Sequence, residues 1–255
     1  MGFLTEMVSR VREDLDRTPL PEGTLLLRTR SVQPAVDFEG ALRGPGISVI
    51  AEVKLASPSA GDIAEVDPGR QAEAYQQGGA AAISVLTEPT RFGGSLADLR
   101  AVRRHTALPV LRKDFIVHPA QVIQSRAEGA DAVLLIAAAL TLSELEELGS
   151  VAEELGMGTL VEAHGDEDLD RAVRSGARIV GVNARDMETL EVDPEAALAL
   201  AQKVPTDRIL VLESGIRSRA DVQRAEAAGA HAVLVGEALM RSTDPGAAIE
   251  QLLGR

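Results

Sequence analysis

Charged side chains stand at the ends of several apolar runs in this chain. Lys54 and Lys113 each close such a run, and loop-like sequence follows each of them directly. Two further runs end in the carboxylates Glu162 and Glu213, and another ends in Asn183. Charged groups gathered at the C-terminal ends of several strands are what a (β/α)8 barrel uses for catalysis. The pattern therefore predicts an enzyme.

Two glycine turns follow the last two apolar runs. Gly215 comes just after Glu213, Gly236 follows the run 232–235, and a helical segment begins after each turn. Small residues at these positions of a barrel let backbone N–H groups reach phosphate oxygens. The alternative interpretation is that the glycines only turn the chain. Their joint occurrence after the seventh and eighth runs favours a phosphate site.

Eight short apolar runs alternate with amphipathic segments, and these elements must position the charged groups. The runs are 49–53, 82–86, 110–113, 132–136, 159–162, 179–183, 209–213 and 232–235. Strict alternation of strand and helix predicts a parallel sheet, and eight units predict closure into an α/β fold, the (β/α)8 TIM barrel. No Gly-x-Gly-x-x-Gly follows any run, which argues against a dinucleotide-binding domain.

A Gly-Ala pair recurs at the ends of four predicted helices. The glycines are Gly79, Gly129, Gly176 and Gly229, and an apolar run follows each one closely. Glycine ends a helix in the left-handed conformation at the least cost. This repeat is the strongest sequence evidence for the fold.

Residues 1–47 precede the first predicted strand. Apolar residues at helical spacing predict a helix at the start of this arm, and a second short helix is predicted near 37–42. We expect one domain over residues 1–255. In it the barrel comprises 48–255, and the N-terminal arm is a helical extension over the barrel mouth.

Composition excludes several classes of function. The 255 residues carry 39 acidic against 26 basic side chains, a net charge of −13, and only 2% aromatics. A nucleic-acid groove needs a basic stripe and stacking aromatics, so no nucleic-acid partner is expected. An anionic small molecule is compatible with this acidic composition as a ligand, because a few cations at strand ends make a local positive pocket.

Cysteine and histidine usage narrows the chemistry further. There is no Cys, which excludes disulfides, thiolate zinc sites and a cysteine nucleophile. The four His are scattered without metal-ligand spacing, so no metal site is predicted. The longest apolar stretch, 132–142, is too short to span a bilayer, and the N-terminus does not resemble a secretory signal. We therefore expect a cytoplasmic protein without membrane contact.

Taken together, these features resemble the indole-3-glycerol-phosphate synthase family of tryptophan biosynthesis. The segment Glu52-Val-Lys-Leu-Ala-Ser-Pro-Ser59 is specific to that family, and Leu111-Arg-Lys-Asp-Phe-Ile-Val117 and Gly181-Val-Asn-Ala-Arg-Asp186 join it. Glu213-Ser-Gly-Ile216 is shared more widely among phosphate-binding barrels. The resemblance covers essentially the whole chain. It implies a carboxy-lyase that closes the ring of 1-(2-carboxyphenylamino)-1-deoxyribulose 5-phosphate, with loss of CO2 and water, by general acid/base catalysis and without a cofactor.

The resemblance also implies roles for individual residues. Lys113 would be the general acid, Glu162 would handle protons in dehydration, and Lys54 would pair with the substrate carboxylate and help to hold the phosphate. The residues that orient the lysines and the substrate hydroxyls would be Glu52, Asn183, Glu213 and Ser214. The residues in contact with the substrate would be Ser57, Arg185, Phe92, Phe115, Leu134 and Leu190, of which the last four would form an apolar slot for the ring. The residues in contact with the phosphate would be Lys54, Gly215, Gly236 and Glu237. A buried structural ion pair is the alternative interpretation of each lysine–carboxylate pair.

Some positions depart from the family pattern. Leu55 and Ala60 replace basic residues that some members carry beside Ser-Pro-Ser, so this loop is less cationic. Ala184 stands where many members have Asn or Ser. Glu237 is anionic, and its side chain is expected to point away from the phosphate.

Two rival functions make different predictions. A phosphoribosylanthranilate isomerase is expected to pair an acid and a base, often Cys with Asp, and this chain has no Cys. A catalytically silent scaffold would have lost its strand-end charges, which are present together here. The expected partner is an anionic, phosphorylated small molecule. We predict a monomer and leave contact with other tryptophan-pathway enzymes open.

Overall fold

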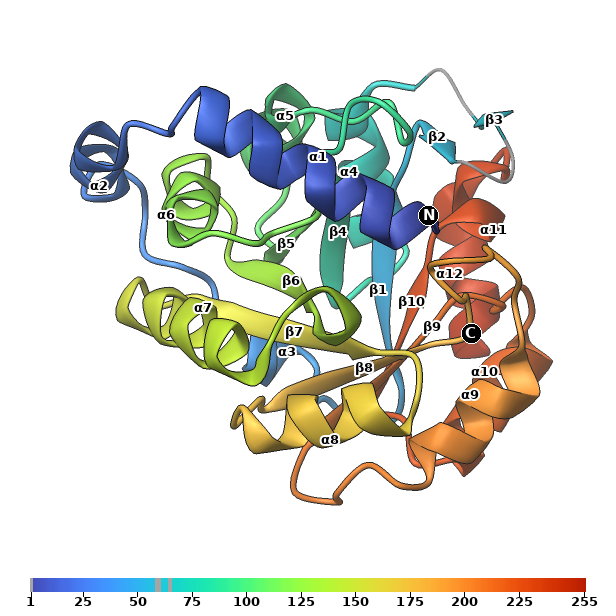
Figure 1. The fold of residues 1–255 in the computed structure, drawn as a ribbon. Coiled ribbons are helices and arrows are strands. Elements are labelled where there is room, and N and C mark those ends of the chain that lie inside the picture. The colour runs from blue at the N-terminus through green and yellow to red at the C-terminus, as the bar shows by residue number, and fades with distance from the viewer. Residues whose placement is uncertain (1, 58–60, 64–65) are drawn as a thin grey trace.

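The barrel closes as the sequence predicted. The computed structural model describes residues 2–57, 61–63 and 66–255, without the side chains of Ser57 and Asp62. Its parallel strands pair in the order β1-β10-β9-β8-β7-β6-β5-β4, and β1 also pairs with β4 (Figure 1). The strands are β1 (Ser48–Val53), β4 (Ala82–Leu86), β5 (Val110–Lys113), β6 (Ala132–Ile136), β7 (Gly158–Ala163), β8 (Ile179–Asn183), β9 (Ile209–Glu213) and β10 (Ala232–Val235). The (β/α)8 fold is therefore confirmed.

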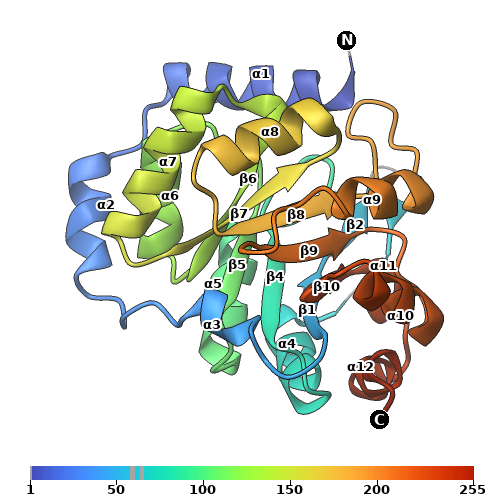
Figure 2. The same ribbon diagram turned by 90° about the horizontal axis from the view of Figure 1, so that it is seen from below.

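Helices surround this barrel (Figure 2). They are α4 (Pro68–Gln77), α5 (Leu96–His105), α6 (Pro119–Ala127), α7 (Leu142–Glu154), α8 (Asp166–Arg174), α9 (Pro194–Ala201), α10 (Arg219–Ala227) and α12 (Pro245–Leu253), with the short η1 (Ala137–Ala139) and α11 (Glu237–Met240) after β6 and β10. Polar N-caps start several of them, including capping boxes at Thr141 and Ser218. The four glycines expected to end helices all have positive φ, between 82° and 97°. No helix among the described residues is both long and apolar enough to cross a membrane.

Alternation along the strands directs the charged groups into the barrel. Successive side chains of a strand point to opposite faces, so residues two apart share a face. In four strands the residue two positions before the charged one belongs to the same buried cluster: Ile50, Leu111, Leu160 and Val211. Glu52, Lys113, Glu162 and Glu213 therefore continue the interior face to the C-terminal end of the barrel.

The N-terminal arm covers more than the mouth. Helix α1 (Phe3–Arg17) lies across the C-terminal end, where the Leu4 N–H donates to the Met187 carbonyl at 3.0 Å. Helix α2 (Glu22–Thr29) lies beside α6, and α3 (Phe38–Ala41) lies at the opposite end, with Phe38 against Gly158 at the start of β7 (Figures 1 and 2). The expectation that the whole arm lies over the mouth is therefore wrong for α2 and α3.

Helix α2 and a small hairpin were not predicted. Helix α2 begins directly after Pro21, its N-cap residue, because a proline at a helix start removes no helical hydrogen bond. A small antiparallel hairpin, β2 (Ala56–Ser57) with β3 (Gly61–Asp62), follows β1. The hairpin lies in a segment rich in Pro, Gly and Ser, and α2 follows two prolines; local sequence patterns assign such segments to loops.

Candidate active site

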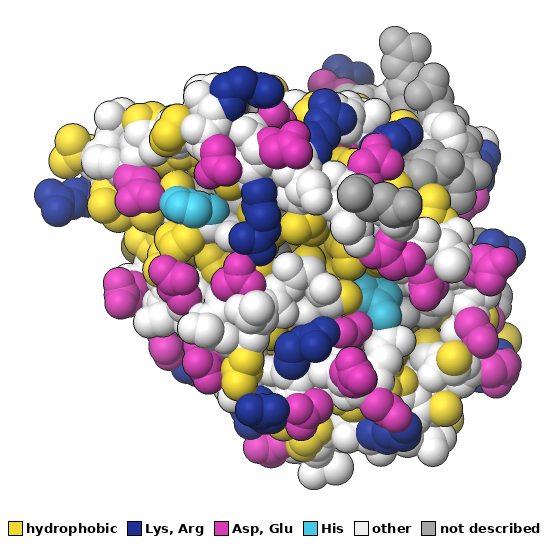
Figure 3. Space-filling model, in the orientation of Figure 1, with side chains coloured by type: hydrophobic (Ala, Val, Ile, Leu, Met, Phe, Trp, Pro, Cys, Tyr) yellow, Lys and Arg dark blue, Asp and Glu magenta, His cyan; other side chains and the backbone are white. Residues whose placement is uncertain are grey.

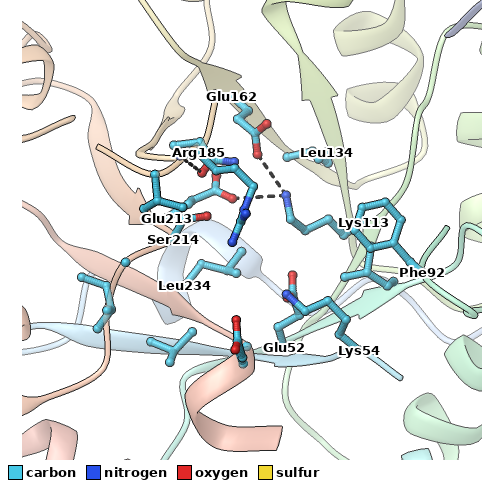
Figure 4. Close-up of a pocket in the computed structure, with 18 of the residues that line it drawn as sticks. Glu52, Lys54, Phe92, Lys113, Leu134, Glu162, Arg185, Glu213, Ser214 and Leu234 are labelled. Atoms are coloured by element: carbon cyan, nitrogen blue, oxygen red, sulfur yellow. Dashed lines mark hydrogen bonds and ion pairs between the residues drawn. The ribbon is translucent and has the colours of Figure 1, made fainter. Parts of the chain in front are cut away.

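A single cavity of about 310 Å³ at the C-terminal ends of the strands brings the predicted residues together (Figure 4). Its lining includes Glu52, Lys54, Phe92, Lys113, Phe115, Leu134, Glu162, Asn183, Arg185, Leu190, Glu213, Ser214, Gly215, Gly236 and Glu237. Ser57 is the remaining predicted residue, and its side chain lies outside the described part of the structure. This end of the barrel is where enzymes of this fold have their active sites.

The centre of the cavity is a lysine held between two buried carboxylates. Lys113 Nζ lies 2.9 Å from Glu162 Oε2 and 3.3 Å from Glu213 Oε2 (Figure 4). Both carboxylates are only 1% exposed, and Lys113 is 15% exposed. Gly181 on β8 makes room for this arrangement, because a Cβ at that position would overlap the Glu213 carboxylate.

The protonation states of this trio follow from burial and charge. Burial alone would lower the pKa of Lys113, but Glu162, Glu213 and Glu52 outweigh it and raise the pKa above its usual range. Burial would raise the pKa of Glu162, but Lys113 and His164 hold it well below its usual range. Burial raises the pKa of Glu213 to about 8, which Lys113 opposes and Glu162 reinforces. At neutral pH the trio therefore holds a charged lysine, an ionised Glu162 and a protonated Glu213.

A second lysine–carboxylate pair lies beside the last strand. Lys54 Nζ is 2.7 Å from Glu52 Oε1, and the Glu52 side chain is 3% exposed. A Cβ at position 236 would overlap the Glu52 carboxylate and lie 3.2 Å from Lys54 Nζ. Gly236 has φ of −118°, so its backbone does not require glycine. The position needs glycine because the pair occupies the space that a side chain would take.

The turn after β9 has an unusual backbone. Ser214 and Gly215 are consecutive left-handed residues, with φ of 64° and 76°. A left-handed serine costs free energy, and such conformations cluster at ligand sites. Both residues line the cavity, and so does Arg217, two residues further along the chain. The left-handed turn therefore forms part of the cavity wall.

Glu237 does not stand alone at this rim. Its Oε1 lies 3.1 Å from Nε of Arg241, one helical turn further on, and both residues line the cavity. The sequence led us to expect that the Glu237 side chain points away from the phosphate. In the structure its negative charge is balanced by the ion pair with Arg241. The sequence analysis missed Arg241, although its four-residue spacing from Glu237 is a helical ion-pair signal.

Aromatic rings form one side of the cavity. Phe92 and Phe115 line it, with ring centroids 6.4 Å apart, and Phe3 from α1 packs behind them at 6.3 and 6.2 Å. We call Phe3, Phe92 and Phe115 the aromatic wall. Leu134 and Leu234 continue the apolar surface, and the second of these was not predicted. The geometry provides a slot for a planar apolar ring.

A buried carboxylate fixes the loop that carries Phe92. The two oxygens of Glu88 accept from the Thr90 N–H (2.8 Å), the Thr90 hydroxyl (2.5 Å), the Arg91 N–H (2.7 Å) and the Phe92 N–H (3.1 Å). Glu88 is 4% exposed. Sequence reasoning missed this residue, although a carboxylate just after a strand end was the signal used elsewhere in the chain.

The loop after β8 is tied both to the cavity and to α1. Arg185 donates its backbone N–H to Asn183 Oδ1 at 3.0 Å and a guanidinium N–H to the Leu190 carbonyl at 2.9 Å. Leu190 is left-handed, with φ of 65°. The Glu188 carboxylate accepts from the Thr5 hydroxyl at 2.7 Å. The loop and the arm therefore hold each other in place over the site.

The fold and the site define a (β/α)8 barrel enzyme with a buried acid–base cluster and an apolar slot at the C-terminal ends of its strands. A family model for indole-3-glycerol phosphate synthase matches residues 4–252. The Rhodococcus opacus indole-3-glycerol phosphate synthase is 54% identical over 256 residues, 99% of this chain and 95% of that protein. The Micrococcus luteus protein of the same name is 51% identical over 253 residues, 96% and 94% of the two chains. The chain belongs to the indole-3-glycerol phosphate synthase family, as its motifs predicted.

Solved structures of lower identity share the fold. A tryptophan synthase alpha-subunit mutant from Pyrococcus furiosus has a TM-score of 0.63 at 19% identity, covering 82% of this chain and 98% of that one. A thiamine phosphate pyrophosphorylase from the same organism has a TM-score of 0.62 at 17% identity, covering 84% and 96%. At these identities the likeness concerns the barrel alone.

Proposed function

We propose that this enzyme, a carboxy-lyase of tryptophan biosynthesis, converts 1-(2-carboxyphenylamino)-1-deoxyribulose 5-phosphate to indole-3-glycerol phosphate. Membership of the family supports the reaction. The observation that carries the mechanism is the placement of Lys113 between two buried carboxylates in a cavity with an aromatic wall. A proton donor and a proton acceptor thus share one desolvated site with a slot for the substrate ring.

The chemistry of ring closure needs one proton given to the ketone oxygen, a second given to the hydroxyl that leaves as water, and one proton removed from the substrate. The ring carbon that bears the carboxylate attacks the ketone carbon, and the ketone oxygen takes a proton to become a hydroxyl. The carboxylate then leaves as CO2, and its bonding electrons return to the ring. Loss of the hydroxyl as water and of one proton completes the indole. No electron leaves the substrate, so no redox cofactor enters this sequence.

Lys113 is the proposed donor to the ketone oxygen. Its charged form predominates because two carboxylates surround it. Glu162 is its ionised neighbour and the proposed base in dehydration. Glu213, protonated at neutral pH, is proposed to orient the lysine. Positioned acid–base groups of this kind contribute about two to four orders of magnitude in rate.

The two anionic ends of the substrate need separate partners. Lys54 is the proposed partner of the substrate carboxylate and also supports the phosphate, and Glu52 balances its charge in the empty site. The proposed phosphate donors are the backbone at Gly215 and Gly236 together with cavity-lining arginines such as Arg185. The proposed contacts of the substrate hydroxyls are Asn183, Ser214 and Ser57.

The aromatic wall is the proposed contact for the anthranilate ring. Leu134 and Leu190 complete the slot. Figure 3 shows acidic and basic side chains intermixed on the face it draws, without a continuous basic stripe on the described part of that face. This surface agrees with a small phosphorylated substrate as the ligand.

One assay tests the function directly. Purified protein is given the carboxyphenylamino-deoxyribulose phosphate in the presence of a chelator, and indole fluorescence is followed. We expect product to accumulate. Phosphoribosylanthranilate, the substrate of the rival isomerase, should not be consumed. Absence of product from the first substrate would reject the proposal, and product that forms only after a metal is added would reject its metal-free part.

A further inference from the structure

A histidine lies directly behind Glu162 and has no part in the mechanism above. His164 follows the last residue of β7, and its Nε2 is 3.2 Å from Glu162 Oε1. The other oxygen of the same carboxylate, Oε2, faces Lys113. His164 is 11% exposed and is not among the residues that line the cavity. It therefore contacts the proposed base from the side away from the substrate.

A second carboxylate holds the histidine from behind. Asp168 Oδ2 lies 3.8 Å from His164 Nδ1 and accepts the His164 backbone N–H at 3.1 Å. Arg171 donates to the other oxygen of Asp168 at 2.5 Å, and its Nε donates to the Ala137 carbonyl at 3.2 Å. Asp168 is thereby fixed by three elements: the end of β7, α8 and η1. The imidazole ring lies between a fixed carboxylate and the proposed base.

The groups around the imidazole favour its charged form. Glu162 contacts it from β7 and Asp168 from α8, and Asp186 in the loop after β8 interacts with it electrostatically; Arg171 is paired with Asp168, and Lys113 lies beyond Glu162. Burial alone would lower the pKa of His164, but Asp168 and Glu162 outweigh it and raise the pKa to about 10. Asp168, His164, Glu162 and Lys113 therefore form an array of alternating charge.

We propose that His164 is a positioning residue, an imidazolium that keeps Glu162 ionised and directed at Lys113. The inference rests on the proposed function of Glu162 as a base. The contact of His164 with Glu162 is an ion pair and not an aligned hydrogen bond, and it leaves the other oxygen, Oε2, facing Lys113. Without the imidazolium, Glu162 and Glu213 would compete more equally for one lysine, and the pKa of Glu162 would rise.

The kinetic test compares His164→Gln with a matched control, His105→Gln. His105 is exposed at the end of α5, where its Nδ1 lies 2.8 Å from the Ala101 carbonyl. For His164→Gln we expect kcat on the acidic limb of the pH profile to fall about tenfold at a given pH and KM to stay within about twofold, because a rise of one unit in the pKa of Glu162 lowers its ionised fraction there about tenfold. The acidic limb of the kcat profile should move up by about one pH unit. The control should match the wild type in all three.

A second measurement reads the histidine itself. The chain has four His, so 15N-histidine labelling gives a small set of ring resonances, and replacement of His105, His118 and His231 in turn identifies the one that belongs to His164. We expect this resonance to report an imidazolium up to about pH 9. Asp168→Asn should lower the pH at which that imidazolium loses its proton and should reduce kcat on the alkaline side. This second variant keeps the test open if His164→Gln fails to fold.

Three results would overturn the inference: a neutral His164 ring at pH 8, an unshifted kcat profile in a folded His164→Gln enzyme, or a loss confined to melting temperature. Failure of the proposed function is distinguishable. A wild-type protein that makes no product would reject the reaction, whereas the ring resonance would still decide the state of His164.

Discussion

Two replacements of Lys113 distinguish the role of its positive charge from its role as a proton donor. Lys113→Met removes both, and Lys113→Arg keeps a cation between Glu162 and Glu213 but cannot give up a proton, because the guanidinium pKa is above about 12. If the lysine is the proton donor, both variants should lose kcat and kcat/KM together. If only a cation is needed, Lys113→Arg should remain active.

The magnitudes follow from the burial of the trio. Loss of a positioned acid costs about two to four orders of magnitude, or about 3 to 5 kcal/mol of transition-state stabilisation. Lys113→Met also leaves the ionised Glu162, 1% exposed, without its closest cation. Removing one partner of a buried pair costs about 3 kcal/mol or more of folding stability. This deficit should shrink as the pH falls, because a protonated carboxyl needs no counter-charge.

The assay combines single-turnover fluorescence, product binding by calorimetry and urea unfolding. Both Lys113 variants should bind indole-3-glycerol phosphate, and only Lys113→Met should be strongly destabilised at pH 7. Lys54 provides the comparison: Lys54→Met should mainly raise KM, and Lys54→Arg should restore part of the loss. An active Lys113→Arg together with an inactive Lys54→Arg would show that the two roles are exchanged.

Three further predictions concern other parts of the site. Gly236→Ala should raise KM at least tenfold, since its Cβ would overlap the Glu52 carboxylate, whereas Gly149→Ala on α7, where a Cβ meets nothing within 4 Å, should leave KM unchanged and stabilise the fold by up to about 1 kcal/mol. Because the folded chain retains the Glu213 proton up to a pKa of about 8 and the unfolded chain releases it near 4.5, stability should decline with rising pH between these values, and Glu213→Gln should flatten that slope in urea titrations. Glu88→Gln should raise KM for the substrate more than it lowers kcat, because an amide cannot accept all four hydrogen bonds that hold the loop of the aromatic wall; an unchanged KM would assign Glu88 to stability alone.

Local sequence determined the barrel and the principal charged residues of its site. Each strand is a short apolar run, and four helices end in glycines that take a left-handed conformation, so the limits of these elements depend on neighbours in the chain. Because alternation along a strand is fixed, the run ending at Lys113 also fixes which way that lysine points. Glu162 and Glu213 also end their runs, so the sequence puts them at the same end of a parallel barrel as Lys113.

Tertiary structure alone decided which distant side chains meet. Phe3 completes the aromatic wall from the first helix, although no local pattern links it to Phe92 or Phe115. His164 is two residues from Glu162 and four from Asp168, but only the folded structure buries the three groups together and makes the histidine a counter-charge. The position of a side chain in the periodic pattern of a strand or helix determines the face that it occupies. Its contact partners and its pKa depend on the burial and the charges that other segments of the folded chain provide.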